Sequence, residues 1–169
     1  MKLLPAIVAR RSAKRFSARQ VSKECVERIL QAGRLAPSAK NRQEWRFIVV
    51  NRHDIREKLA SASFGAEQIE TASVVVAVCT TNVDYRMPNG QLSFPVDLGI
   101  AAAFMMLQAT HDGVESCAMT TFDEQEVQDL LSIPHAMRVV VMLAFGYTDQ
   151  QLPPQGRKPL SDIVAYNHW

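Results

Sequence analysis

The stretch Arg34-Leu-Ala-Pro-Ser-Ala-Lys-Asn-Arg-Gln-Glu-Trp-Arg-Phe-Ile-Val-Val50 contains a helix end, a polar loop and a strand in direct succession. Pro37 predicts the end of the helix, because the residue before a proline is pushed out of the α region and proline cannot continue the hydrogen-bond ladder. Residues 38–43 are mostly polar, and the aromatic and β-branched residues 45–50 predict a strand that returns to the core. We therefore expect a loop held rigidly between two buried elements, where a ligand could bind.

Further helices and apolar strands are predicted on both sides of this stretch. Helices are expected at residues 5–10, 22–36, 53–62, 95–110 and 123–133, with Ser22 as the cap of the second and a capping box at Asp123 at the start of the last. Strands are expected at residues 45–50, 72–80, 114–119 and 139–145. The helix after Ser22 is expected to bury the face made of Val26, Ile29, Leu30 and Gly33. The strands at 74–78 and 139–145 are apolar without alternation, which is typical of strands covered on both faces. These features predict α and β layers with helices on each side of a sheet.

Three segments raise the question of a partner or a lid. The helix at 95–110 is apolar on every side, which indicates burial on every side, either under a second copy of the chain or as the central helix of a monomer. Residues 82–94 carry turn signals and two aromatic side chains, Tyr85 and Phe94, so they are interpreted as a lid or as a plain surface loop. Residues 149–169 have too few core residues to fold alone and are expected to reach a partner subunit.

Length and composition exclude several classes of protein. A chain of 169 residues, 47% hydrophobic and 21% charged, is expected to form one globular domain over residues 1–169, neither disordered nor membrane-spanning. Residues 1–20 lack the apolar core of a secretory signal, and the three cysteines lack a disulfide or zinc-ligand spacing, so a cytoplasmic protein without a metal site is expected. A net charge of +2 gives no reason to expect nucleic acid as a partner. Glycine-rich dinucleotide, Walker and H-E-x-x-H motifs do not occur.

The positive charge is concentrated at the N-terminus. Residues 1–23 hold seven lysines and arginines and no acid, with Ser12 among them. A charge run alone is usually a solvated surface. Because a phosphate needs both cations and short hydroxyl or amide donors, the combination around Ser12 favours phosphate binding.

Two motifs identify a resemblance to a known family. Ala36-Pro-Ser-Ala-Lys-Asn-Arg-Gln-Glu-Trp-Arg-Phe47 resembles the nitroreductase pattern Pro-Ser-x-x-Asn-x-Gln-Pro-Trp-x-Phe, and Arg10-Arg-Ser-Ala-Lys-Arg-Phe16 resembles the N-terminal signature of the same family. The resemblance implies an α+β fold with three α/β/α layers, a central, mostly antiparallel sheet and a domain-swapped homodimer. Glu44 stands where the family usually has proline, and we expect it to alter the stiffness of the loop more than its chemistry.

The resemblance also implies that FMN is the cofactor and assigns residues to it. Arg10, Arg11 and Ser12 are expected to contact the phosphate and ribityl chain of FMN, and Lys14 is expected to lie near the pyrimidine edge of the flavin ring. The loop that reaches the flavin from the other subunit is expected to consist of Pro37, Ser38, Ala39 and Asn41. The segment beside the central ring of the flavin is expected to consist of Ala118, Met119, Thr120 and Thr121. Arg157 completes the phosphate site, with Lys158 as the alternative register. Gln68 is a candidate for a contact with the flavin ring or an exposed helix residue.

The implied activity is an FMN-dependent oxidoreductase that transfers hydride from NAD(P)H through flavin N5 to nitroaromatic, quinone or related acceptors by a ping-pong mechanism. No side chain is expected to be catalytic, because the flavin supplies the reactive atom, and Lys14 and Thr121 are expected to tune it. Thr121 occupies a position where the family often has glycine, so it is expected to narrow the site or change the backbone angle. A dehalogenase or flavin-cleaving enzyme, an FMN-binding sensor or storage module and a basic interaction domain without flavin remain alternatives.

Overall fold

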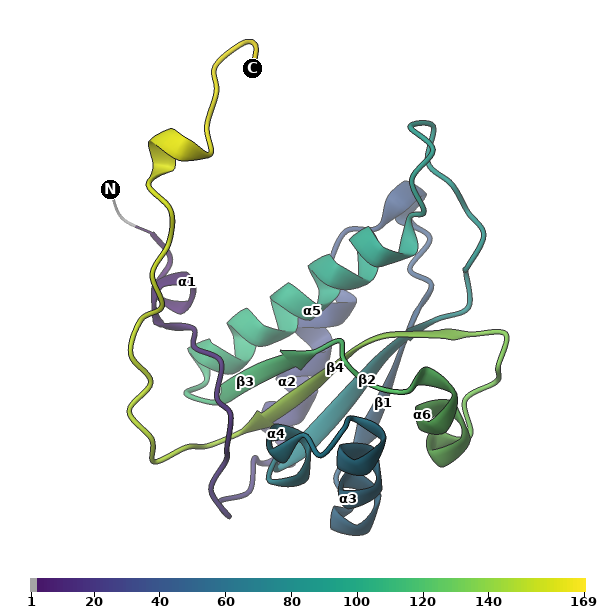
Figure 1. The fold of residues 1–169 in the computed structure, drawn as a ribbon, viewed down its shortest axis with the longest axis vertical. Coiled ribbons are helices and arrows are strands. Elements are labelled where there is room, and N and C mark those ends of the chain that lie inside the picture. The colour runs from purple at the N-terminus through teal and green to yellow at the C-terminus, as the bar shows by residue number, and fades with distance from the viewer. Residues whose placement is uncertain (1–2) are drawn as a thin grey trace.

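The computed structural model describes residues 3–169, which form a sheet with helices on both faces (Figure 1). The helices are α1 (Pro5–Ala9), α2 (Lys23–Arg34), η1 (Ala39–Asn41), α3 (His53–Ala62), α4 (Glu67–Glu70), α5 (Phe94–His111), α6 (Glu124–Leu131) and η2 (Leu160–Asp162). The strands are β1 (Trp45–Val50), β2 (Val74–Thr80), β3 (Glu115–Met119) and β4 (Arg138–Gly146). The sequence predicts each strand within two residues of its observed ends.

The sheet has the strand order β1-β2-β4-β3, and every pair of neighbouring strands is antiparallel. A single parallel bridge joins Ser12 to Ser116 at the outer edge of β3. The expected mostly antiparallel sheet is therefore confirmed, with β1 and β3 as its edge strands.

Two apolar clusters cover the two faces of this sheet. One cluster joins Ile29 of α2 and Leu98 of α5 to strand residues such as Val76, and the other joins Leu59 of α3 and Val127 of α6 to the opposite face. Figure 1 shows α2 and α5 on one side of the strands and α3, α4 and α6 on the other. The three-layer α+β fold is confirmed, and it follows from strands that carry apolar side chains toward both faces.

The helix ends follow the predicted capping chemistry. The Ser22 hydroxyl accepts a hydrogen bond from the amide of Cys25, and the Asp123 carboxylate accepts one from the amide of Glu126. Gly113 follows α5 with a φ of +73°, the left-handed conformation that glycine adopts without steric cost.

The predicted inward face of α2 is confirmed, with Val26 and Leu30 at its edge and Cys25 as a further member. Its fully buried residues are Cys25, Ile29 and Gly33, whereas Val26 and Leu30 are only half-buried. The missing side chain of Gly33 lets Met105 of α5 approach closely, and a Cβ added there would meet the Met105 methyl carbon.

Helix α5 is not buried on every side within one chain. Leu98, Ala101 and Met105 are fully enclosed, whereas Val96 and Phe104 are 44% and 40% exposed. The expectation of complete burial is therefore wrong for a single chain, since the sheet and α2 cover only one side of the helix. A second copy over the open side stays a prediction.

The tail after β4 returns along the body and then leaves it. Residues 152–157 lie beside α1 and the segment that follows it, whereas residues 158–169 are exposed throughout. Figure 1 shows the yellow end of the chain projecting beyond the rest of the fold. Within residues 3–169, no helix has the length and apolar character needed to cross a membrane.

Candidate functional site

The basic N-terminal segment runs along the open edge of β3. The amide of Ala13 donates to the carbonyl oxygen of Ser116 at 3.2 Å, beside the bridge between Ser12 and Ser116. Ala13 and Phe16 are buried, which fixes the segment against the core, whereas Lys14 is exposed. Burial raises the pKa of the Cys117 thiol, opposed by the charges of Lys14 and Arg10, so both cations lie near β3.

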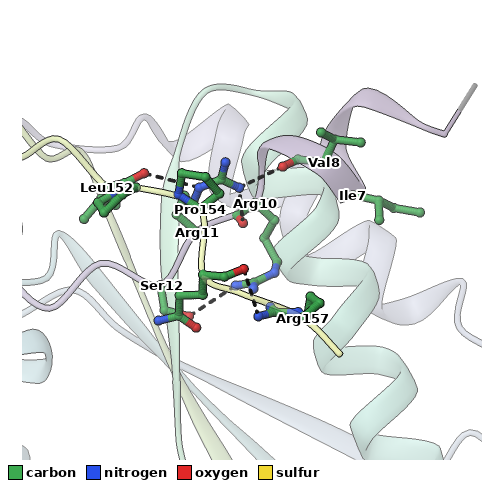
Figure 2. Close-up of a pocket in the computed structure, with 10 residues that line it drawn as sticks. Ile7, Val8, Arg10, Arg11, Ser12, Leu152, Pro154 and Arg157 are labelled. Carbon is green, nitrogen blue, oxygen red and sulfur yellow. Dashed lines mark hydrogen bonds between the residues drawn. The ribbon is translucent and has the colours of Figure 1, made fainter. Parts of the chain in front are cut away.

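A cavity of about 460 Å³ lies between this segment and the tail (Figure 2). The residues that line it are Ile7, Val8, Arg10, Arg11, Ser12, Leu152, Pro153, Pro154, Gln155 and Arg157. Arg10 Nη1 donates to Ser12 Oγ at 3.2 Å. None of the lining residues is acidic, and guanidinium and hydroxyl groups are the donors that bind a phosphate dianion, so these residues fit the phosphate end of FMN.

Arg11 lines the cavity beside Arg10 and Ser12, and its side chain also binds main-chain oxygens. Its Nε donates to the Leu152 carbonyl oxygen at 3.2 Å, and its Nη1 donates to the carbonyl oxygens of Val8 and Arg10 at 2.7 and 3.0 Å. Arg11 therefore ties the tail to the N-terminal segment. Arg157, farther along the tail, lines the cavity, whereas Lys158 does not; both residues are exposed.

Glu115, the first residue of β3, is a site neighbour that the sequence did not reveal. Its Oε2 atom is buried and has no hydrogen-bond partner among residues 3–169. Burial raises the pKa of this carboxyl group, and the charges of Arg11 and Arg10 oppose the rise. An acid at the start of a strand normally lies on the surface, so its sequence position gave no signal.

The far end of β3 holds the segment assigned to the flavin ring. Ala118, Thr120 and Thr121 are exposed, and Met119 is buried. Gln68 Nε2 donates a hydrogen bond to Met119 Sδ at 3.6 Å, so α4 packs against this end of β3. Thr121 is not among the residues with positive φ, so the threonine causes no left-handed backbone there.

The loop at residues 37–41 lies elsewhere, at the first turn of α5. The amide of Ala39 donates to Asp97 Oδ1 at 2.9 Å. Pro37 and Asn41 are exposed, and Ser38 and Ala39 are half-buried. In the part of the chain that the structure describes, no hydrogen bond or ion pair joins this loop to the basic cavity or to residues 118–121. One chain therefore does not bring all the assigned residues together.

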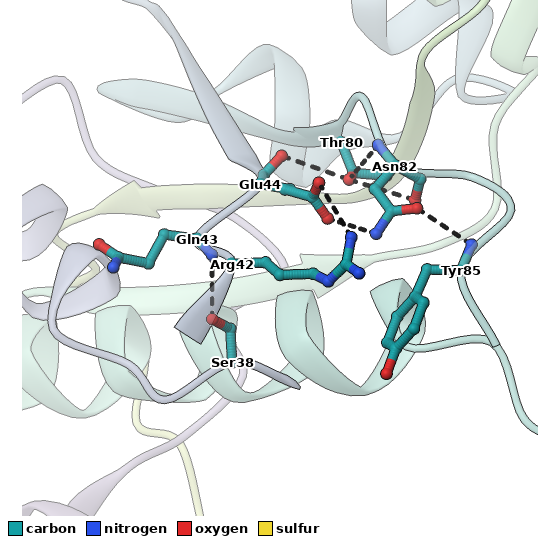
Figure 3. A network of polar contacts seen from close by, with 7 residues as sticks. All are labelled: Ser38, Arg42, Gln43, Glu44, Thr80, Asn82 and Tyr85. Carbon is teal, nitrogen blue, oxygen red and sulfur yellow. Dashed lines mark hydrogen bonds and ion pairs between the residues drawn. The ribbon is translucent and has the colours of Figure 1, made fainter. Parts of the chain in front are cut away.

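Polar contacts hold the loop in an unusual backbone shape (Figure 3). Lys40, Asn41 and Gln43 each have a φ of 54°, a conformation that costs non-glycine residues free energy unless the surroundings maintain it. Ser38 Oγ accepts a hydrogen bond from the Gln43 amide at 3.0 Å. Glu44 connects the same loop to the end of β2 through Asn82.

Comparisons with known proteins identify the family. The family model described as "Nitroreductase family" matches residues 7–92 and 66–147. A provisionally named NADH dehydrogenase/NAD(P)H nitroreductase of Archaeoglobus fulgidus is 32% identical over 148 residues, which cover 85% of this chain and 84% of that protein.

Solved structures show the same fold. A nitroreductase family protein from Clostridium difficile 630 superposes with a TM-score of 0.87 at 30% identity, covering 100% of both chains. The NADPH:FMN oxidoreductase from Vibrio harveyi, solved with NAD+, gives a TM-score of 0.87 at 24% identity, covering 97% of this chain and 76% of that one. With its two signature motifs and the matched model over most of its length, the chain belongs to the nitroreductase family.

Proposed function

We propose that the protein is an FMN-dependent oxidoreductase that takes hydride from NAD(P)H and reduces nitroaromatic, quinone or related organic acceptors in a ping-pong reaction. Bound FMN would supply the two-electron redox chemistry, since no side chain of the site is needed as a nucleophile or metal ligand. The names of the relatives support this class: one contains NAD(P)H nitroreductase and another NADPH:FMN oxidoreductase.

The observation that carries the proposal is the meeting of both chain ends at one basic cavity. Arg10 and Ser12 come from the N-terminal segment and Arg157 from the tail, and all three line the same space. In the proposed complex they hold the FMN phosphate. Lys14 lies further along the β3 edge, where a positive charge would stabilise the anionic reduced flavin and raise its potential.

The second part of the proposed site comes from another copy of the chain. The loop at residues 37–41 shares no polar contact with the basic cavity in the described chain, and its Asn41 side chain is exposed. In a homodimer, this loop would reach the flavin of the partner, and the exposed side of α5 would lie in the interface. Each of the two sites would then be built from both subunits.

Replacement of the phosphate ligand tests the proposal. Arg10→Ala is expected to weaken FMN binding about 10- to 100-fold, because a hydrogen bond to a charged group contributes roughly 1.5–3 kcal/mol. Asn41→Ala is expected to weaken it as well. Titration of the apoprotein with FMN, followed by flavin fluorescence, measures both.

Arg19→Ala is the matched control, because Arg19 is an exposed arginine of the same basic region that stacks on the Tyr147 ring instead of lining the cavity. Unchanged FMN affinity in both Arg10→Ala and Asn41→Ala would refute the site assignment. Tight FMN without oxidation of NADH or NADPH would indicate a sensor or storage protein instead.

A further inference from the structure

The two carboxylate oxygens of Glu44 contact two different side chains, those of Asn82 and Arg42. Oε2 accepts a hydrogen bond from Asn82 Nδ2, just after β2, and Oε1 pairs with Arg42 Nη1 at 3.9 Å. The main-chain oxygen of Glu44 also accepts a hydrogen bond from Thr80 Oγ1 at 3.3 Å. Figure 3 shows these groups converging from the loop and from the end of the strand. Proline at this position, the usual residue of the family motif, would provide neither side-chain contact.

Asn82 and Arg42 carry the connection on to Tyr85. Asn82 Oδ1 accepts a hydrogen bond from the Tyr85 amide at 3.0 Å, and the Arg42 guanidinium carbon lies 4.1 Å from the centroid of the Tyr85 ring. The contacts therefore close a ring of four residues: Glu44, Asn82, Tyr85 and Arg42. A closed ring with a charge in it resists opening more than its separate members, since each contact holds the next in position.

Tyr85 lies at the base of a hairpin formed by residues 85–93. Its carbonyl oxygen accepts a hydrogen bond from the Ser93 amide at 3.1 Å, and the Met87 amide donates to the Gln91 carbonyl oxygen at 2.8 Å near the tip. Figure 1 shows this segment projecting from the body between β2 and α5. Asn82 and Arg42 fix the base of the hairpin, and Glu44 holds both of these residues. The direction of the hairpin therefore depends on Glu44.

The other side of the ring is the loop at residues 37–43. Asp97 anchors Ala39, and Ser38 anchors Gln43, so the left-handed residues between them are held at both ends. Arg42 belongs to this loop and also stacks on Tyr85. A movement of the hairpin base must therefore displace Arg42, and through it the backbone next to Asn41.

We propose that Glu44 is a positioning residue that couples the hairpin at residues 85–93 to the loop at residues 37–41, and that this coupling sets the size of acceptor admitted to the site. The coupling stands on the described contacts alone. Its consequence for acceptor size rests on the proposed function, in which Asn41 contacts the flavin.

Hydrogen–deuterium exchange of the full chain tests the coupling without any cofactor. In Glu44→Ala, the amides of Gln43, Tyr85 and Ser93 are expected to exchange about tenfold faster or more, which corresponds to about 1.4 kcal/mol of lost protection. Glu44→Gln retains an acceptor for Asn82 and is expected to restore part of the protection. Glu57→Ala removes an exposed carboxylate with a similar weak ion pair, to His53, and should leave both segments unchanged.

Tyr85→Ala tests the same connection from its other end. Loss of the ring removes the Arg42 contact, so exchange in residues 38–43 is expected to rise although no residue of that loop has changed. Coupling between two positions is reciprocal, so both substitutions must loosen both segments. If either variant loosens only its own segment, the proposed coupling is wrong, and the second variant gives this answer even if Glu44→Ala fails to fold.

Steady-state kinetics of the FMN-loaded protein test the consequence for acceptor size. The ratio of KM values for a two-ring and a one-ring quinone is expected to fall about threefold or more in Glu44→Ala and to return toward the original value in Glu44→Gln. An unchanged ratio in a protein whose loops have loosened would overturn the size selection. If the unaltered protein binds no flavin, the proposed function fails, whereas the exchange experiment still decides the coupling.

Discussion

At the scale of single residues, Glu115 is a carboxyl group whose environment disfavours its charge. Burial raises its pKa above the ordinary 4.5, and Arg11 and Arg10 offset only part of that rise. Between pH 4.5 and the higher folded-state pKa, the native protein holds a proton that the unfolded protein has released, so stability falls as the pH rises across this range. The loss is complete once the pH exceeds the folded-state pKa.

Glu115→Gln is expected to remove this loss. The variant should be more stable than the unaltered apoprotein at pH 7 to 8 by on the order of 1 kcal/mol, the typical cost of an unpaired buried polar group, and equally stable near pH 4. Urea unfolding at both pH values measures the difference. Glu70→Gln is the control, because Glu70 is exposed and its side chain makes no polar contact among residues 3–169. A Glu115→Gln variant that is less stable at pH 8 would contradict this account.

Residue roles were predictable where the motif itself specifies the side chain. Arg10, Ser12 and Arg157 were expected at one phosphate site, and they line one cavity. The contacts of Glu44 and Glu115 were not predictable, because each depends on residues that the fold brings close from distant parts of the chain. Arg11 matched the signature, but the hydrogen bond from its Nε to the Leu152 carbonyl oxygen was not predictable, because the fold brings these two residues together from opposite ends of the chain.

At the scale of secondary-structure elements, the contact between α2 and α5 depends on Gly33. Gly33→Ala is expected to destabilise the protein by about 1–2 kcal/mol, because the added Cβ would meet Met105 and overpacking outweighs the gain in helix propensity. Urea denaturation measures the change. In a Met105→Ala background, the same substitution should cost about 1 kcal/mol less, since the obstructing side chain is gone. Equal costs in the two backgrounds would exclude this contact as the cause.

Most elements were predictable because each is an apolar or amphipathic run bounded by turn or capping residues. The helix expected at 53–62 is α3, and the helix expected at 95–110 is α5, with one more residue at each end. α4 was missed, since four residues are too few to show a period. The strand order could not be predicted from the sequence, because uniformly apolar strands such as β2 and β4 do not indicate which strands they pair with.

At the scale of the whole molecule, the tail presents apolar side chains that the chain itself does not cover. Leu160, Ile163, Tyr166 and Trp169 are 66%, 59%, 82% and 102% exposed. Exposed apolar side chains gathered in one segment indicate an interaction surface. We expect them to pack on a second subunit, so sedimentation analysis should give twice the mass of the 18.9 kDa chain.

Deletion of residues 160–169 is expected to weaken this self-association at least tenfold, because the apolar contacts are lost while Arg157 remains in place. Serine at those four apolar positions in the full-length chain is the matched control for chain length, and it should weaken association to a similar degree. A truncated chain that dimerises as strongly as the complete one would contradict the proposed role of the tail.

The most direct test of the central claim is an absorption spectrum of the purified protein after FMN is added and excess is removed by desalting, followed by anaerobic addition of NADH or NADPH. The account predicts that flavin bands remain with the protein and bleach with at least one nucleotide. A protein that retains no flavin would contradict it, because the basic cavity formed by Arg10, Ser12 and Arg157 would then have no FMN phosphate to hold.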